Sequence, residues 1–288
     1  MDALNPEAIP WWAKLAAKIV LSRLPVSYDR WRSLGIFRHG AMHQTSYALD
    51  VFMRHYTRAQ PYLAPGFVAL ELGPGDSLAS ALIARAFGAS RTYLVDAGPF
   101  ASGTAVARYN DLCDALAERG RPIAGAPFTT VDAMLAAVGA TYLTRGLDSL
   151  RSIASQSVEL VFSQAVLEHI ALDEFDATIA ELYRISRPGG VSSHRVDLQD
   201  HLAHGLNSLR FSRSIWESRL FATSGFYTNR LRARDVVDGF TRAGFVVLER
   251  VDERWPSLPL RPRQLHPDFA ALPESELLIR GFDLLACR

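Results

Sequence analysis

The stretch LELGPGDSL, Leu70 to Leu78, decides the fold class of this chain. An apolar run ends in two glycines, and a helical pattern of small and apolar residues begins directly after them. Glycines at this point let the backbone turn tightly and let a ligand approach the N-terminus of the helix, where free N–H groups and the helix dipole point at it. By itself this turn is equally compatible with an ordinary tight turn or a dinucleotide site.

From Phe67 onward, short apolar runs alternate with helical periods, which is typical of a mostly parallel sheet with helices on its faces. We expect strands at 67–72, 91–95, 141–144, 158–162, 191–197, 245–251 and 277–287, the last two joined as a hairpin. Helices are expected near 105–119, 130–138, 173–185 and 233–243. The chain is therefore predicted to be one α/β domain over 66–288, preceded by a helical cap over 1–65.

Composition excludes several classes of function. The 288 residues carry 31 Lys and Arg against 30 Asp and Glu, a formal charge of +1, so no global field favours nucleic acid. Cys113 and Cys287 match no metal or redox spacing, and we expect reduced thiols in a cytoplasmic protein. No apolar run is long enough for a transmembrane helix.

The segment from Pro10 to Pro25 is the nearest thing to a membrane element. It predicts a helix with an apolar face formed by Trp12, Leu15, Ile19 and Leu24 and with Lys14, Lys18 and Arg23 nearby. We expect a capping helix packed on the domain, and weak peripheral membrane contact is the alternative.

Four motifs in order carry a resemblance. Glu71-Leu72-Gly73-Pro74-Gly75 resembles the first motif of class I S-adenosylmethionine (SAM)-dependent methyltransferases of type 11/12. TYLVDAG places Asp96 after the second strand, VELVFSQAVLEHI resembles the fourth-strand motif, and ELYRISRPGG resembles the approach to strand five. The resemblance covers about 66–197 and implies a Rossmann-like seven-stranded sheet, mostly parallel with an antiparallel last strand. It also implies SAM as cofactor and S-adenosylhomocysteine as product.

The resemblance assigns roles residue by residue. Glu71, Gly73 and Gly75 would shape the methionine end of the cofactor site, and Asp96 would accept hydrogen bonds from the ribose. Ser163 and Gln164 would flank the cofactor near the transferred methyl group.

Three positions near the cofactor leave alternatives open. Asp148 is the candidate beside the adenine, with Leu147 or the main chain as alternatives. The loop departs from the family at Ser77, and Asp76 either caps the helix or reaches the amino group of SAM. A dehydrogenase would require a third glycine where Leu78 stands.

Ligands of open α/β sheets bind at the carboxyl ends of the strands, so the residues after strands four and five are the candidates for catalysis. His169 is the first choice for a proton acceptor, and its alternative is a hydrogen bond to the backbone. His194 and His201 are further candidates.

The stretch HRVDLQDHLAH, 194–204, raises the question of a metal. Along a regular strand His194 and Val196 share one face and Asp197 points to the other, so His194 and Asp197 do not ligate one ion. A helix beginning near Asp197 would pair Asp197 with His201 and Asp200 with His204. Some methyltransferases of hydroxyls hold a divalent ion with Glu and His at a motif similar to Glu168-His169. Another acid often stands there where this chain has Gln164, so a divalent metal is the less favoured alternative.

Residues 198–232 are expected to form a lid over the substrate together with the N-terminal helices. Asp197, Tyr227, Asn229 and Arg230 suit an acceptor with hydroxyls or a carboxylate, since arginine offers a planar bidentate fork. Arg232 and Arg234 are expected to be solvated at the start of a helix.

The sequence thus predicts a SAM-dependent methyltransferase that methylates an oxygen, a hydroxyl or a carboxylate, of a small polar acceptor in a biosynthetic pathway. The segments RHGAM, HRVDLQDH and NRLR resemble methyltransferases of bacterial glycan or secondary-metabolite pathways. The alternatives are a small-molecule N-methyltransferase, a non-catalytic SAM-binding module and an NAD-dependent dehydrogenase.

Overall fold

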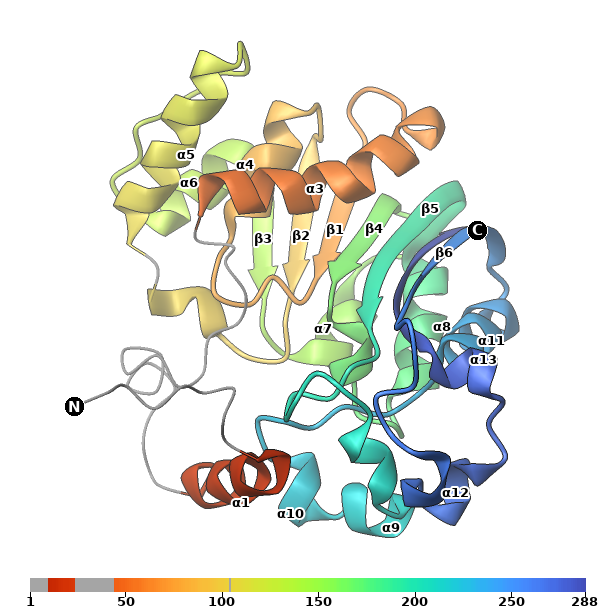
Figure 1. Ribbon diagram of the computed structural model, residues 1–288. Helices are drawn as coiled ribbons and strands as arrows, with labels where there is room; N and C mark the ends of the chain where they lie inside the picture. Colours follow the sequence, from red (N-terminus) through yellow and green to blue (C-terminus); the bar gives the residue numbers. More distant parts are fainter. Residues whose placement is uncertain (1–9, 24–43, 104) are drawn as a thin grey trace, which may run out of the picture.

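A seven-stranded sheet organises the molecule (Figure 1). The computed structural model describes residues 10–23, 44–103 and 105–288. The strands are β1 Val68–Leu72, β2 Arg91–Val95, β3 Ala140–Leu143, β4 Val158–Gln164, β5 Ser186–Asp197, β6 Val246–Arg254 and β7 Ile279–Cys287. Their order is β3-β2-β1-β4-β5-β7-β6.

The pairing explains why the strands alternate with helices in sequence. β3, β2, β1, β4 and β5 pair in parallel, and parallel neighbours require a crossover connection, which is usually a helix. β7 lies between β5 and β6 and runs antiparallel to both. The predicted mostly parallel sheet with an antiparallel last strand is confirmed.

One face of the sheet is covered by α3 Thr45–Ala59, α4 Ala79–Ala86, α5 Val106–Glu118 and α6 Val131–Val138. The short η2 Gln60–Tyr62 extends α3, and η3 Phe100–Gly103 precedes α5. From α3, Leu49 and Phe52 pack on Phe162 of β4 and Leu82 of α4 in one core cluster. The expected N-terminal cap is therefore divided, because α3 belongs to the helical layer of the sheet.

The other face is covered by α7 Gly146–Ser152, α8 Phe175–Ile185 and α11 Ala233–Ala243. Phe175, Ile179, Leu182 and Ile185 recur every three or four residues along α8, so they line one side of the helix and are buried. The predicted helix near 173–185 forms for this reason.

A third group of short helices lies beyond the carboxyl ends of the parallel strands (Figure 1). It consists of α1 Trp11–Leu21, η5 Asn207–Arg210, α9 Arg213–Trp216, α10 Arg219–Ala222, η6 Pro262–Gln264, α12 Pro267–Ala270 and α13 Glu274–Leu277. The turn η4 Leu167–His169 connects β4 to this end of the molecule. These short helices therefore face the carboxyl ends of the parallel strands, where the candidate site residues were predicted.

The apolar face of α1 differs from the expected one. Trp11, Leu15 and Ile19 pack on the domain, whereas Trp12 is 61% exposed, because the buried stripe of the helix begins one residue earlier than predicted. Leu24 of the predicted face, and Trp31, Phe37 and His39 of the expected lid, lie outside the described residues. Within the described part of the chain, no helix has the length and apolarity needed to cross a membrane.

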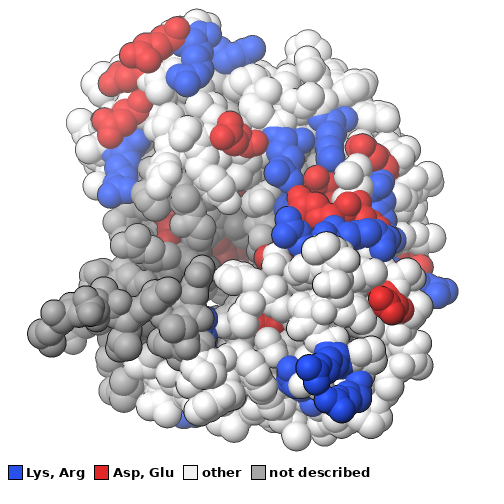
Figure 2. Space-filling model, viewed as in Figure 1, with Lys and Arg blue, Asp and Glu red and all other residues white. Residues whose placement is uncertain are grey.

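Charged side chains of both signs are interleaved on the surface (Figure 2). Part of this pattern joins α3 to the antiparallel strands, since Arg58 pairs with Asp283 of β7 at 3.2 Å. Arg195 of β5 pairs with Glu253 of β6 at 2.6 Å. These pairs hold the β7-β6 end of the sheet against the parallel part.

Candidate active site

The glycine loop between β1 and α4 is tightly packed against the end of β4. Gly73 has φ +72°, a left-handed conformation that glycine adopts without strain. A Cβ atom at this position would lie 2.5 Å from Cγ2 of Val166, so any side chain would displace the segment after β4. The glycine loop, residues 73–78, therefore packs directly on the end of β4 and Val166. We call these segments together the rim.

Asp96 follows β2 and lies against the same loop. Its Oδ2 accepts a hydrogen bond from the Gly75 N–H at 2.8 Å, and its Oδ1 accepts from the Ala97 N–H at 2.7 Å. The side chain belongs to a residue that is 8% exposed. Both carboxylate oxygens accept hydrogen bonds from the backbone, so Asp96 is held in place against the glycine loop.

Glu71 lies inside the rim, on β1. Burial raises the pKa of its carboxyl to about 8, so the group is mostly protonated at pH 7. Its Oε2 has no hydrogen-bond partner among the described residues. A buried polar oxygen without a partner at the end of a strand is a candidate ligand contact.

The remaining predicted cofactor residues differ in their surroundings. Asp76 is buried beside the loop, and Ser77 Oγ accepts a hydrogen bond from the Ala79 N–H at 3.3 Å at the start of α4. Asp148 lies in the first turn of α7, where its side chain is 65% exposed and pairs with Arg151 at 2.9 Å. Asp148 thus has a partner in solvent, and the first residue of its helix, Gly146, donates its N–H to the Asp96 carbonyl at 2.8 Å.

The end of β4 places its two polar residues in different environments. Ser163 is fully buried, and its Oγ lies 2.7 Å from Nδ1 of His194. The Oε1 atom of Gln164 is buried and has no hydrogen-bond partner among the described residues. Ala165 follows with φ +53°, and its N–H donates to the Arg195 carbonyl at 2.8 Å. A left-handed non-glycine residue carries strain, which often marks a functional turn.

His194 is enclosed in the sheet. Its Nδ1 contacts Ser163 Oγ and its Nε2 contacts Ser192 Oγ, both at 2.7 Å, and the residue is 0% exposed. Burial, together with the charge of His55, lowers the pKa of His194 to about 3, so its ring is neutral at pH 7. The helix layer covers it through the Phe240 ring. The predicted catalytic role of His194 is not supported, because both ring nitrogens are occupied and no acceptor reaches them.

His55 of α3 is a second buried histidine, and it packs against Ser193 of β5. Its Nδ1 lies 2.9 Å from Ser193 Oγ, and burial lowers its pKa to about 4. The sequence analysis did not single it out. Its place in α3, four residues after Val51, is the signal that would have put it on the buried face of that helix.

His169 and His201 meet at the edge of the sheet. Nδ1 of His169 lies 3.0 Å from the Tyr227 carbonyl oxygen, and since a carbonyl only accepts, Nδ1 carries a proton. The two Nε2 atoms are 3.1 Å apart, and the rings stack with centroids 4.8 Å apart and planes at 12°. In the neutral pair, Nε2 of His169 therefore accepts and Nε2 of His201 donates. A pair that shares one proton is suited to accept a second one.

Glu168, the residue before His169, is buried and bonded to the segments around the histidine pair. Burial raises the pKa of its carboxyl to about 8, its Oε1 accepts from the Asp197 N–H at 3.3 Å, and its Oε2 has no partner in the described chain. Its main-chain carbonyl accepts from the Asn229 N–H at 2.7 Å. Glu168 thus joins the ends of β4 and β5 to the segment after α10, a role that the sequence analysis did not assign.

The residues predicted to bind the acceptor in the 224–232 segment serve as internal fasteners. The Tyr227 hydroxyl donates to Glu217 at 2.6 Å, and Asn229 Nδ2 donates to the Leu167 carbonyl at 2.8 Å. The Arg230 side chain is 2% exposed and donates to the Phe211 carbonyl at 2.8 Å. These contacts join the segment to the rest of the lid and to the turn after β4, and the contact of these residues with the acceptor stays a prediction.

The two arginines that follow have opposite environments. Arg232 is buried and donates to the Leu198 carbonyl at 3.1 Å, so its predicted solvent exposure is wrong. The Arg234 side chain is 80% exposed, as expected. The buried arginine ties α11 to the residues that follow β5.

The stretch 198–204 forms a turn rather than a helix, so the two predicted helical pairs do not form. Asp200 is 2% exposed and organises the turn, since its carboxylate accepts from the N–H groups of Leu202, Ala203, Gly205 and Asn207. Asp197 accepts from Gln199 at 3.0 Å. Among the described residues, no group of three or more His, Cys, Asp or Glu is arranged to hold a metal ion.

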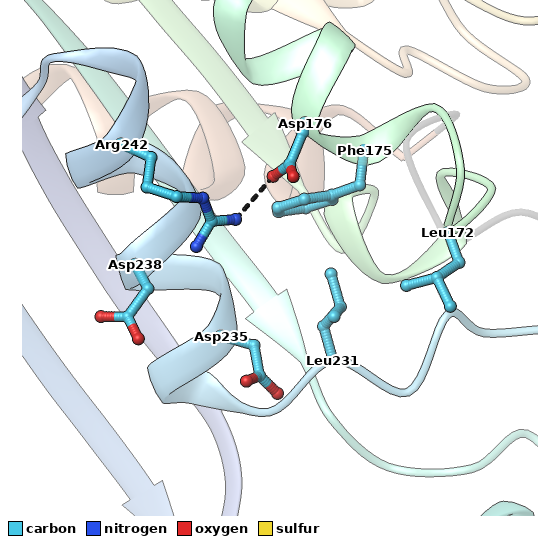
Figure 3. A pocket seen from close by; sticks show the side chains of 7 residues that line it. All are labelled: Leu172, Phe175, Asp176, Leu231, Asp235, Asp238 and Arg242. Atoms are coloured by element: carbon cyan, nitrogen blue, oxygen red, sulfur yellow. Dashed lines mark hydrogen bonds and ion pairs between the residues drawn. The ribbon is translucent and has the colours of Figure 1, made fainter. Parts of the chain in front are cut away.

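A pocket of about 160 Å³ lies between α8 and α11 (Figure 3). Its acidic residues have partners: Asp176 pairs with Arg242 at 2.7 Å, and Asp235 accepts from the Arg232 N–H at 2.9 Å. Figure 3 shows Asp176 and Arg242 joined across the two helices, with Phe175 and Leu231 beside them. This pocket belongs to the packing of the outer helices and contains none of the predicted site residues.

A protein-family comparison matches the part of the chain that contains the glycine loop and Asp96. Residues 70–193 match the protein family described as "Methyltransferase domain". No curated protein sequence matches the chain at a significant level. This match spans the glycine loop, Asp96, the end of β4 and the first part of β5.

Three of the similar solved structures illustrate the level of likeness. An S-adenosylmethionine-dependent methyltransferase from Mesorhizobium loti is 16% identical, with 83% of this chain and 100% of that chain covered and a TM-score of 0.47. A SAM-dependent methyltransferase from Methanosarcina mazei is 16% identical, with coverages of 81% and 97% and a TM-score of 0.49. The geranyl diphosphate C-methyltransferase from Streptomyces coelicolor, in complex with Mg²⁺, geranyl diphosphate and S-adenosyl-L-homocysteine, is 13% identical, with coverages of 84% and 79% and a TM-score of 0.48.

Proposed function

The chain carries a methyltransferase domain of the SAM-dependent class, and we propose that it methylates an oxygen of a small polar acceptor, with the His169–His201 pair as general base. The observation that carries this proposal is the pair itself, with Nδ1 of His169 held by the Tyr227 carbonyl and Nε2 facing His201. The expected enzyme class and cofactor are both in agreement with the family match.

The residues of the rim fit the cofactor. Asp96 is fixed by the loop, with its carboxylate directed to the Gly75 and Ala97 N–H groups at the end of β2. Gly73 lets the loop pack closely on Val166 after β4, and the buried Oε2 of Glu71, which has no partner among the described residues, lies on the neighbouring strand β1. SAM, when bound, supplies an activated methyl group on a sulfonium. We therefore keep Glu71, Gly73, Gly75, Asp96 and Gln164 as proposed cofactor residues, with Asp76 and Ser163 beside them.

The chemistry asks the protein for two things. The acceptor oxygen must lie in line with the methyl carbon, and holding reactants in such a geometry is worth effective molarities of about 10⁵ to 10⁸ M. A hydroxyl acceptor must also lose its proton, and a general base adds about 10² to 10⁴-fold. His201 takes that proton at Nδ1 and passes its Nε2 proton to Nε2 of His169, so the imidazolium forms on His169, where the Tyr227 carbonyl accepts the hydrogen bond from Nδ1–H.

The lid is proposed to consist of α1 and residues 198–232, over a methyltransferase domain that begins at residue 66. Supporting this division, α1 packs on the aromatic side chains of the 198–232 segment rather than on the sheet. We also infer a cytoplasmic location, which the free thiols of Cys113 and Cys287 support.

The first experiment measures cofactor binding by calorimetry with SAM and NAD side by side. We expect SAM to bind and NAD not to bind. Asp96→Asn should weaken SAM binding about 10- to 100-fold, the value of a lost hydrogen bond to a charged group. Asp148→Asn tests the proposed contact beside the adenine, and Asp114→Asn, at an exposed position of α5, is the matched control that should bind SAM as the wild type does.

The second experiment offers methyl-labelled SAM with a panel of sugars, phenols, carboxylic acids and amines. Label on a hydroxyl or carboxyl oxygen is the expected product. Label on nitrogen would replace the proposal with N-methylation, and SAM binding without turnover on any panel member would favour a binding module. Binding of NAD in place of SAM would contradict the proposed function altogether.

A further inference from the structure

The helix α1 packs against one aromatic group of the lid. We call this group the lid cluster; it contains Leu202, Trp216, Phe221, Phe226 and Tyr227. α1 contributes Trp11, Leu15 and Ile19 to it, and the Trp11 ring meets Phe211 edge to face at 6.2 Å. Figure 1 shows α1 beside α10, far from α3 in space although near it in sequence.

Two members of the lid cluster are directly connected to the histidine pair. Leu202 follows His201 in the chain, and the Tyr227 carbonyl accepts the hydrogen bond from His169. The packing of α1 therefore reaches both rings through different residues. A displacement of α1 would move the support of His201 and that of His169 together.

A polar contact reinforces this packing. The Lys18 ammonium donates a hydrogen bond to the His201 carbonyl at 3.0 Å, between residues that are 183 positions apart. Burial is the main reason why the pKa of Lys18 is lowered, so the ammonium is partly withdrawn from water to make this contact. A lysine that served only solubility would keep its charged end in solvent. The bond fixes the backbone of His201 at the residue whose ring faces His169.

We propose that Lys18 is a positioning residue for the catalytic pair and that the docking of α1 sets the geometry of His201. This inference rests on the proposed function and adds a residue from the N-terminal helix to it. Lys18 contacts no reacting atom; it holds the His201 carbonyl so that the ring stacks on His169 with the two Nε2 atoms in contact.

The test compares Lys18→Met, Lys18→Arg and Lys14→Met in the full chain. Lys18→Met keeps most of the apolar stem and removes the donor, and Lys18→Arg restores a donor. Lys14→Met is the matched control, since Lys14 lies one turn earlier on the same helix and the same charge is removed. ¹H–¹⁵N spectra of histidine-labelled protein report the tautomer of each ring without any acceptor.

We expect the wild type and Lys14→Met to show His169 protonated at Nδ1 and His201 protonated at Nε2. In Lys18→Met the His201 signal should move toward a mixture of tautomers, and Lys18→Arg should restore it. With an acceptor from the labelling panel, kcat should fall about tenfold or more in Lys18→Met, as expected for a lost charged hydrogen bond, while KM for SAM stays unchanged.

Two results would overturn the inference. One is a Lys18→Met protein that melts earlier but keeps the wild-type tautomers and kcat, which would make the contact structural. The other is an equal fall of kcat in Lys14→Met, which would make the effect one of net charge. Failure of the proposed function is distinguishable, because then replacement of His169 would leave turnover intact whatever Lys18 does.

Discussion

Two histidines are buried in the core, and two others lie beyond the carboxyl ends of β4 and β5. The side chains are the same, but their surroundings are opposite. His194 and His55 are buried, with both ring nitrogens of His194 and Nδ1 of His55 bonded to serine hydroxyls, and their pKa values are lowered to about 3 and about 4. His169 and His201 lie at the end of the strands, bonded to a carbonyl and to each other. Burial with hydroxyl partners makes a histidine a neutral core residue, and a strand end with a fixed Nδ1 proton makes it a candidate base.

The largest expected effect is on turnover at His169. Replacement of His169 by Ala should lower kcat about 10² to 10⁴-fold, the contribution of a general base, with SAM binding unchanged. His204→Asn is the control. His204 lies in the same turn as His201, is exposed, and has φ +53°, a conformation that Asn tolerates. Single-turnover rates with labelled SAM measure the difference, and equal rates for both variants would remove His169 from the mechanism.

The converse effect is on stability at His194. His194→Ala should lower the free energy of unfolding by about 2–4 kcal/mol, because it leaves a cavity and two buried serine hydroxyls without a partner. His169→Ala should cost about 1 kcal/mol or less, since that ring is exposed. Urea denaturation compares the two, and a reversed order would contradict the assignment of core and edge.

The buried histidines also predict a dependence of stability on acid. The unfolded chain takes up protons near the ordinary histidine pKa of about 6.5, whereas the folded chain does so only near 4 for His55 and 3 for His194. Stability therefore falls as pH decreases from about 6.5, by at most about 1.4 kcal/mol per pH unit for each histidine. Between pH 6 and 4, the slope of the unfolding free energy against pH measures the protons taken up on unfolding. In His194→Gln this number should be about one lower than in the wild type, and an unchanged slope would show that the pKa of His194 is not lowered in the folded chain.

Glu168 affects the pH dependence of stability with the opposite sign. Its pKa is raised to about 8 in the folded chain, so the folded state binds the extra proton and stability falls as pH rises from about 4.5 to about 8. Glu168→Gln stays neutral and should gain about 3 kcal/mol of stability over the wild type at pH 8, relative to their difference at pH 5. Glu174→Gln at an exposed position is the control. Parallel curves for all three proteins would exclude a buried, protonated Glu168.

Local patterns in the sequence were sufficient to predict the sheet. The strand and helix periods predicted every strand of the sheet, because alternation with helices leaves few ways to connect parallel strands. The cofactor roles of the glycine loop and Asp96 were predicted from the family resemblance, and the structure places both at the ends of neighbouring strands, β1 and β2. These features depend on residues that are close in sequence or adjacent in the sheet.

The lid shows why the rest could not be predicted. Tyr227, Asn229 and Arg230 have the side chains of an acceptor site, but their partners are Glu217, Leu167 and Phe211, which no local pattern connects to them. The alternation along β5 placed His194 and Val196 on one face correctly, yet it did not reveal that α11 covers that face. The partner of a polar side chain is a property of tertiary packing.

The most direct test of the account is the rate at which diethyl pyrocarbonate modifies each histidine at pH 7, measured by peptide mass spectrometry alongside the loss of methyl transfer. The account predicts that His169 reacts in the folded protein at the rate at which activity disappears. His55 and His194 should react only after unfolding in urea. Modification of His194 in the folded protein as fast as His169, or full activity after His169 is modified, would contradict it.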